Sequence, residues 1–131
     1  MADTSDRKVQ RSEQVFIDGA KAPSIRVHAI EGAAETGEIS FKKLIFGDDV
    51  MMVEVFRRKG MIDPKHNHPD HESICYLLSG RARVWVGGQE FIAEPGSAWL
   101  HAPGVDHYSE ALEDCVQLEV KSPPRKTWDG D

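Results

Sequence analysis

Histidine and carboxylate side chains are concentrated in one short segment of the chain. His66 and His68 are separated by one residue, and His71 and Glu72 follow closely. Imidazole nitrogens and carboxylate oxygens are the ligands that suit zinc, iron, manganese and nickel. Because side chains alternate along a β-strand, His66 and His68 would lie on one face of a strand, close enough to bind one ion. The segment therefore predicts a divalent metal site carried by strands.

A second segment with histidines is needed to complete such a site. Residues 96–107 contain an apolar stretch, a Pro-Gly turn and then His107. His101 lies in the stretch before the turn, where it faces either a cavity or the outside. Since the pKa of histidine is ordinarily about 6.5, an inward His101 is a candidate acid–base catalyst. Tyr76, which shares the strand parity of Glu72, is a second candidate catalytic residue.

The two segments resemble the two motifs of the cupin superfamily. The first motif is matched at Gly60, His66, His68, Glu72 and Gly80, and the second at Gly96, Gly104 and His107. Alanine stands at positions 102 and 111, where the second motif has proline and asparagine. The resemblance implies one divalent metal ion per chain, with iron favoured over manganese, zinc or nickel. It also implies the ligand set His66, His68, Glu72 and His107.

The spacing leaves two solutions for Glu72. Seven residues separate it from Gly80, one more than in the motif, and counting back from Gly80 reaches Ser73. A β-bulge between Glu72 and Gly80 would absorb the extra residue and leave the carboxylate on the ion. Otherwise the three histidines alone bind the metal, as in cupin-like thiol dioxygenases. Counting forward from His68 favours Glu72 as a ligand, and we expect the first solution.

Composition narrows the class of protein. The chain has 131 residues and a net charge of −6, with no basic stripe of the kind that binds nucleic acid. No stretch approaches the roughly 20 apolar residues of a membrane helix, and residues 1–14 lack the apolar core of a signal peptide. We therefore expect a cytoplasmic protein with no nucleic-acid or membrane partner. Cys75 and Cys115 lie in apolar runs, as reduced core cysteines do.

The elements around the motifs are short and alternate in polarity. About eight strand-like segments are separated by Gly- and Pro-rich turns, among them Gly87-Gly88, which is typical of a two-residue hairpin. This pattern predicts an all-β fold, in agreement with the antiparallel double-stranded β-helix (jelly-roll, cupin barrel) that the resemblance implies. We expect a disordered tail at 1–14, one barrel domain at 15–121 and a Pro-rich tail at 122–131. Arg57 and Arg58 are interpreted as a solvated strand end.

These features predict a mononuclear metalloenzyme that acts on a small organic molecule. An oxygen-using dioxygenase is favoured, because open positions on a histidine-bound ion suit oxygen and substrate. The alternatives are a metal-dependent isomerase or lyase that acts on a sugar acid, and a non-catalytic binding protein. Arg83, Gln117 or His101 pointing into the cavity would favour a carboxylate or a sugar as ligand. We expect a homodimer, with Trp128 docked on its own barrel or on the partner.

Overall fold

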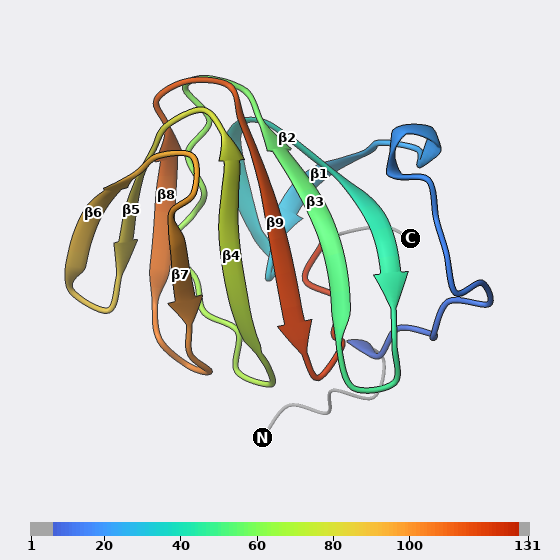
Figure 1. Ribbon diagram of the computed structural model, residues 1–131. Coiled ribbons are helices and arrows are strands. Elements are labelled where there is room, and N and C mark those ends of the chain that lie inside the picture. The colour runs from blue at the N-terminus through green and yellow to red at the C-terminus, as the bar shows by residue number, and fades with distance from the viewer. Residues whose placement is uncertain (1–6, 129–131) are drawn as a thin grey trace.

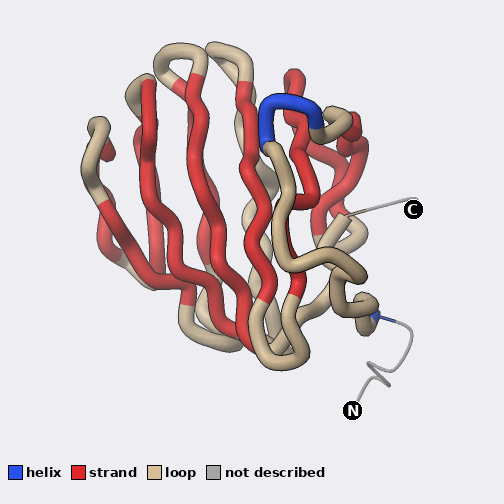
Figure 2. The backbone as a smooth tube through the Cα atoms, turned by 45° about the vertical axis from the view of Figure 1, so that its right-hand side comes forward, coloured by secondary structure: helices blue, strands red, loops and turns tan. Residues whose placement is uncertain are grey.

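The computed structural model describes residues 7–128, and most of this backbone is in strands (Figures 1 and 2). A short 3₁₀ turn lies at Gly19–Lys21. The strands are β1 (Ile25–Ile30), β2 (Ala33–Phe46), β3 (Met51–Arg57), β4 (Glu72–Ser79), β5 (Ala82–Val86), β6 (Gln89–Ala93), β7 (Ala98–His101), β8 (His107–Ala111) and β9 (Cys115–Ser122).

The strands form two antiparallel sheets that curl toward each other (Figure 1). One sheet has the order β1-β2-β3-β9-β4-β7, and the other has the order β6-β5-β8. Apolar side chains from both sheets, such as Val53 on β3 and Val84 on β5, belong to one buried cluster. The predicted all-β, antiparallel jelly-roll barrel is therefore confirmed.

Turn chemistry fixes where the chain reverses. Gly87 and Gly88 join β5 to β6 with φ values of +54° and +93°, which suit a two-residue hairpin turn of the primed type. Residues with a Cβ rarely adopt these angles, so the Gly-Gly pair sets the register of this hairpin. The register in turn places Val84 and Ala82 toward the core.

The inner face of β9 is polar, which is unusual for a core strand. Gln117, Glu119 and Lys121 are buried, while Val116 and Val120 on the opposite face are only partly covered. Buried polar groups need hydrogen-bond or ionic partners. The interior of the barrel therefore contains a polar region beside its hydrophobic core.

Both predicted tails extend beyond the described residues, since 1–6 and 129–131 lie outside them. In the described part, Lys8 pairs with Arg125, and the Lys126 amide donates to the Arg7 carbonyl at 2.7 Å. Trp128 is 9% exposed and packs on Phe41 with 4.6 Å between ring centroids. The C-terminal segment thus docks on its own barrel. Within residues 7–128, no helix has the length and apolar character needed to span a membrane.

Candidate metal centre

Three histidines converge at one end of the barrel interior. His66 and His68 come from the segment before β4, and His107 is the first residue of β8. Backbone hydrogen bonds join His66 and His107 in both directions, at 3.1 and 2.8 Å. Each of the three residues offers a ligand atom that lies within 4.8 Å of the other two. The strand-like spacing of His66 and His68 therefore brings both rings to the same place, as predicted.

The hydrogen bonds of these rings determine which nitrogen is available. The Nδ1 atoms of His66, His68 and His107 lie 2.5, 3.1 and 3.3 Å from Pro64 O, Glu31 Oε1 and Val105 O. Carbonyl and carboxylate oxygens only accept hydrogen bonds, so each Nδ1 carries the proton and each Nε2 keeps a free lone pair. This is the arrangement that oriented metal-binding histidines adopt.

Burial keeps the rings of His68 and His107 neutral. It lowers the pKa of His68 far below its usual range, with a further contribution from Lys121 and the neighbouring histidines. Burial, aided by His66, also lowers the pKa of His107 to about 4. Neutral imidazoles with free Nε2 atoms fit a divalent ion, because the protonated ring cannot bind a metal. The cluster is therefore a candidate metal centre for one ion.

The structure does not bring Glu72 to this cluster, and the expected carboxylate ligand needs correction. Glu72 is exposed on the outer face of β4, while Ser73 and Cys75 face inward. The β4–β9 register does shift between Leu77 and Ser79, so a bulge lies where the spacing predicts one. Upstream of that bulge, alternation places Ser73 inside, and six residues separate Ser73 from Gly80, as in the motif.

Tyr76 is displaced for the same reason. It shares the parity of Glu72, and its side chain is 43% exposed on the outer face of β4. Tyr76 therefore lies outside the cavity, contrary to its prediction as a catalytic residue.

His101 does face the cavity. Its ring stacks on that of His107 with 3.6 Å between centroids, and burial together with His107 lowers its pKa to about 2. Its Nε2 accepts a hydrogen bond from the indole N–H of Trp99 at 3.1 Å, and its Nδ1 lies 4.0 Å from the Cys75 thiol. His101 thus supports the His107 ring, and its role in acid–base catalysis stays a prediction.

Two further polar side chains, those of His71 and Ser73, are buried near the cluster. His71 is fully buried and stacks on His68 with 4.5 Å between ring centroids. Its Nε2 and the Ser73 Oγ have no hydrogen-bond partner among the described residues. Buried polar atoms without partners are rare in native structures and mark places where water or an ion fits.

The structure adds a buried ionic network that the sequence did not reveal. Arg57 was expected at a solvated strand end, but its guanidinium lies inside and contacts Asp63 at 3.2 Å, Gln117 at 2.7 Å and Glu119 at 3.7 Å. Lys121 Nζ lies 3.4 Å from the other oxygen of Glu119. The signal was present in the alternation of β9, where the inward face carries Gln117, Glu119 and Lys121.

The charges in this network determine the ionisation state of the Glu119 carboxyl group. Burial alone would raise its pKa, but Lys121 and Arg57 lower that pKa to about 2. The carboxylate is therefore ionised at neutral pH. Glu119 lines the same cavity as the three histidines.

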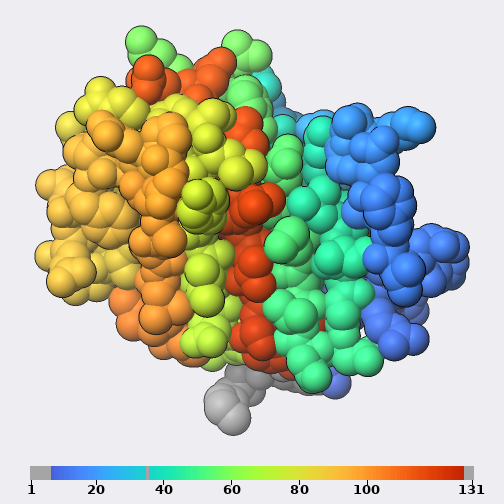
Figure 3. Space-filling model, in the orientation of Figure 1, coloured from blue at the N-terminus to red at the C-terminus, as the bar shows by residue number. Residues whose placement is uncertain are grey.

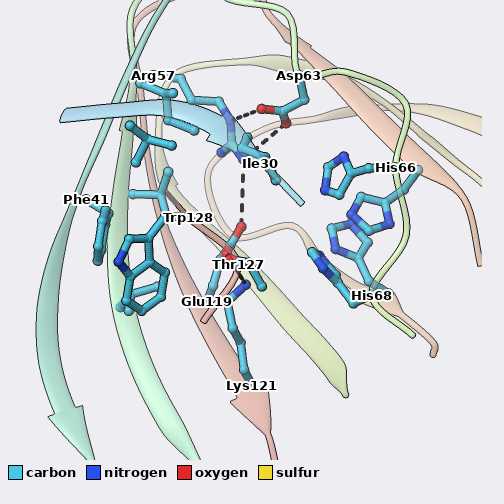
Figure 4. A pocket seen from close by; sticks show the side chains of 16 residues that line it. Ile30, Phe41, Arg57, Asp63, His66, His68, Glu119, Lys121, Thr127 and Trp128 are labelled. Atoms are coloured by element: carbon cyan, nitrogen blue, oxygen red, sulfur yellow. Dashed lines mark hydrogen bonds and ion pairs between the residues drawn. The ribbon is translucent and has the colours of Figure 1, made fainter. Parts of the chain in front are cut away.

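The cavity has two chemically different sides (Figure 4). The histidines occupy one side, Glu119 and Arg57 lie between, and Phe41 and Trp128 form the opposite wall (Figure 4). Of the three groups expected to indicate the ligand, Gln117 and His101 are buried, whereas the side chain of Arg83 is 47% exposed. The arrangement can bind a small molecule whose polar part contacts the histidines.

The chain is similar in sequence and in fold to known proteins. The chain is 33% identical over 93 residues to the pectin degradation protein KdgF of Dickeya dadantii, covering 70% of this chain and 84% of the relative. It is similar to the structure of KdgF from Halomonas sp., with a TM-score of 0.63, 29% identity and coverage of 65% and 78% of the two chains.

Other solved structures support the fold alone. An RmlC-like cupin from Shewanella frigidimarina matches with a TM-score of 0.76 and 23% identity, covering 88% of this chain and 95% of that one.

The model of the cupin domain family matches residues 52–120, which include His66, His68 and His107. The protein therefore belongs to the cupin family.

Proposed function

We propose that this protein is a metal-dependent isomerase or lyase that acts on a small sugar acid or a similar carbonyl compound. The observation that carries the proposal is the pairing, in one cavity, of the three-histidine cluster with the ionised carboxylate of Glu119. Isomerases and lyases of this type move a proton next to a polarised carbonyl group. The similarity to a pectin degradation protein supports a sugar acid as the substrate class.

The position of each cavity residue indicates its role in the proposed reaction. His66, His68 and His107 would hold the ion through Nε2, and the ion would supply the positive charge that polarises a substrate oxygen. Glu119 is the group placed to take a proton from the substrate, since it is ionised and lines the cavity. Arg57 and Lys121 keep that carboxylate ionised and fixed in orientation. Phe41 and Trp128 exclude water from the opposite side.

The test is turnover of sugar acids by protein loaded with Zn²⁺, Mn²⁺, Ni²⁺ or Fe²⁺. Unsaturated galacturonate from enzymatic pectate digestion is the first substrate, followed by ultraviolet absorbance and by NMR in D₂O. We expect conversion by the wild type and a loss of about 100-fold or more in Glu119→Gln, which keeps the side-chain volume. Glu110→Gln, at a half-exposed carboxylate on β8, is the matched control and retains activity. Full activity in Glu119→Gln would contradict the assigned role.

A dioxygenase is the second candidate, because one observation favours it. The structure gathers three histidines without Glu72, which is similar to the three-histidine sites of cupin-like thiol dioxygenases. Oxygen uptake by the iron-loaded protein with thiols or phenols, and no conversion of sugar acids, would favour this candidate over the first.

A further inference from the structure

The turn between β1 and β2 contains a residue that turn chemistry alone would not select. Ile30 pairs with Ala33, so Glu31 and Gly32 form a two-residue turn, and their φ values are +52° and +80°. Turns of this type favour Asn, Asp or Gly at the first position, because other side chains are strained at positive φ. Glu31 is the one non-glycine residue with positive φ within residues 7–128. A strained residue is a reason to look for a role of its side chain.

The Glu31 side chain points at the metal centre. Its Oε1 lies 3.1 Å from His68 Nδ1, and the two side chains are only 10% and 4% exposed. The guanidinium of Arg7 pairs with the same oxygen. The Glu31 amide also donates to the Thr127 carbonyl at 2.9 Å. The N-terminal segment and the C-terminal segment thus hold this residue from both sides.

His68 differs from its two partners in how its ring is oriented. His66 and His107 use carbonyl oxygens two residues earlier in their own loops, Pro64 and Val105. His68 uses a carboxylate that is 37 positions away in the chain. A carboxylate holds the Nδ1 proton more strongly than a carbonyl does, and makes Nε2 a better electron donor to a metal.

We propose that Glu31, held by Arg7, is a positioning residue that fixes His68 with Nε2 directed at the metal. Both residues lie outside 52–120, the segment that the family model matches. The inference rests on the proposed metal centre and adds to it a dependence on the N-terminal part of the chain. It explains why a turn that would suit asparagine or glycine contains glutamate.

The test separates metal affinity from fold stability in the full-length protein. Glu31→Asn places a residue that suits the turn but removes the long carboxylate. We expect its Zn²⁺ affinity, measured at fixed pH by competition with a chromophoric chelator, to fall about tenfold or more. We expect the thermal midpoint of the metal-free variant to equal or exceed that of the wild type, because the turn strain is relieved. A purely structural role would lower both quantities together.

Further variants make the result specific. Glu31→Gln keeps the shape without the charge and is expected to give an intermediate affinity, which also provides the readout if the Asn variant fails to fold. Glu38→Gln removes a carboxylate that is 39% exposed and pairs with Arg26 and Arg58, and its affinity should match the wild type. In ¹⁵N–¹H spectra of the imidazole nitrogens, His68 should lose its fixed Nδ1–H tautomer only in the Glu31 variants.

Two outcomes would overturn the inference, and they differ. Zn²⁺ affinity within twofold of wild type in both Glu31 variants would reject Glu31 as a positioning residue and leave the metal centre intact. A wild-type protein that binds no Zn²⁺, Co²⁺ or Fe²⁺ would reject the metal centre and this inference with it.

Discussion

At the scale of single residues, burial and neighbouring charge fix the ionisation of the cavity. Histidines 68, 101 and 107 are buried and neutral, whereas Glu119 is buried and ionised beside Lys121 and Arg57. Neutral imidazole is the form that binds metal, and an ionised carboxylate is the form that accepts a proton. The same groups make the stability of the protein depend on pH.

The first prediction concerns this pH dependence in metal-free protein. Burial lowers the pKa of His71 and His107 to about 4 and of His101 to about 2. In the unfolded chain these pKa values are about 6.5, so below that pH the unfolded state binds more protons than the folded state. The free energy of unfolding should therefore fall as the pH drops from 6.5 toward 4, by up to about 1.4 kcal/mol per pH unit for each histidine.

Urea denaturation of chelator-treated protein at several pH values measures this slope. The pKa of Glu119 is about 4.5 in the unfolded chain and about 2 in the folded protein. Glu119 therefore lowers the free energy of unfolding further only below about pH 4.5. His101→Gln should reduce the slope between pH 6.5 and 5. A stability that stays constant over that range would mean that these histidines are not buried as described.

The second prediction contrasts two adjacent arginines. The side chain of Arg57 is 8% exposed and pairs with Asp63 and Glu119, whereas that of Arg58 is 62% exposed. Arg57→Met would leave buried carboxylates with less compensation, at an expected cost of about 3–5 kcal/mol in the free energy of unfolding. Arg58→Met should change it by less than about 0.5 kcal/mol. Equal effects in urea denaturation would contradict the buried network.

At the scale of elements, β4 and β9 decide which side chains enter the cavity. They are neighbouring antiparallel strands, with Ser73 paired to Lys121 and Cys75 paired to Glu119. All four side chains are buried, so the inward faces of the two strands coincide. Glu72 and Tyr76 lie on the opposite face because alternation allows no other result over this stretch.

The third prediction concerns Gly80, which ends β4. Its φ is +90°, and a Cβ there would lie 2.2 Å from the Asp114 carbonyl oxygen. Gly60 has nearly the same φ, +91°, but a Cβ there would meet no atom within 4 Å. Gly80→Ala should therefore cost about 3 kcal/mol or more, whereas Gly60→Ala should cost only the backbone strain of about 1–2 kcal/mol. Similar thermal midpoints for the two variants would show that the Gly80 turn has room to move.

Local patterns made much of the site predictable from sequence. His66, His68 and His107 follow from spacing within two short motifs, and their convergence is what strand alternation requires. Glu72 was misplaced because the predicted bulge, between Leu77 and Ser79, leaves Ser73 and not Glu72 on the buried face of β4. The alternation of β9 indicated a polar face, but the pairing of Arg57 with Glu119 was missed because β3 and β9 are far apart in the sequence, and no local pattern shows which strand supplies the partner.

At the scale of the whole molecule, the polarity of β9 leaves an apolar outer face. Ile74 and Leu100 are 52% and 50% exposed, and Ile74 pairs with Leu100 on one side and Val120 on the other. Figure 3 shows β4, β9 and β3 side by side on this face. Exposed apolar patches of this kind are typical of protein interfaces.

The fourth prediction is that this face is where the expected homodimer forms. Ile74→Glu should convert the dimer to a monomer, because pairing two copies would bury the new charge. Ile92→Glu is the matched control, since Ile92 is 43% exposed on β6 of the other sheet. Light scattering after size exclusion distinguishes the two states. A wild-type monomer, or a dimer that Ile74→Glu leaves intact, would contradict this interface.

The most direct test of the central claim is the metal content of untagged protein purified without chelator, expressed as moles of each metal per chain. The cluster of His66, His68 and His107 predicts close to one divalent ion per chain, either as purified or after reconstitution. His107→Ala should lose most of it, and Glu72→Ala should retain it, because Glu72 lies on the outer face. A wild-type chain that holds no metal and takes up none would contradict the metal centre.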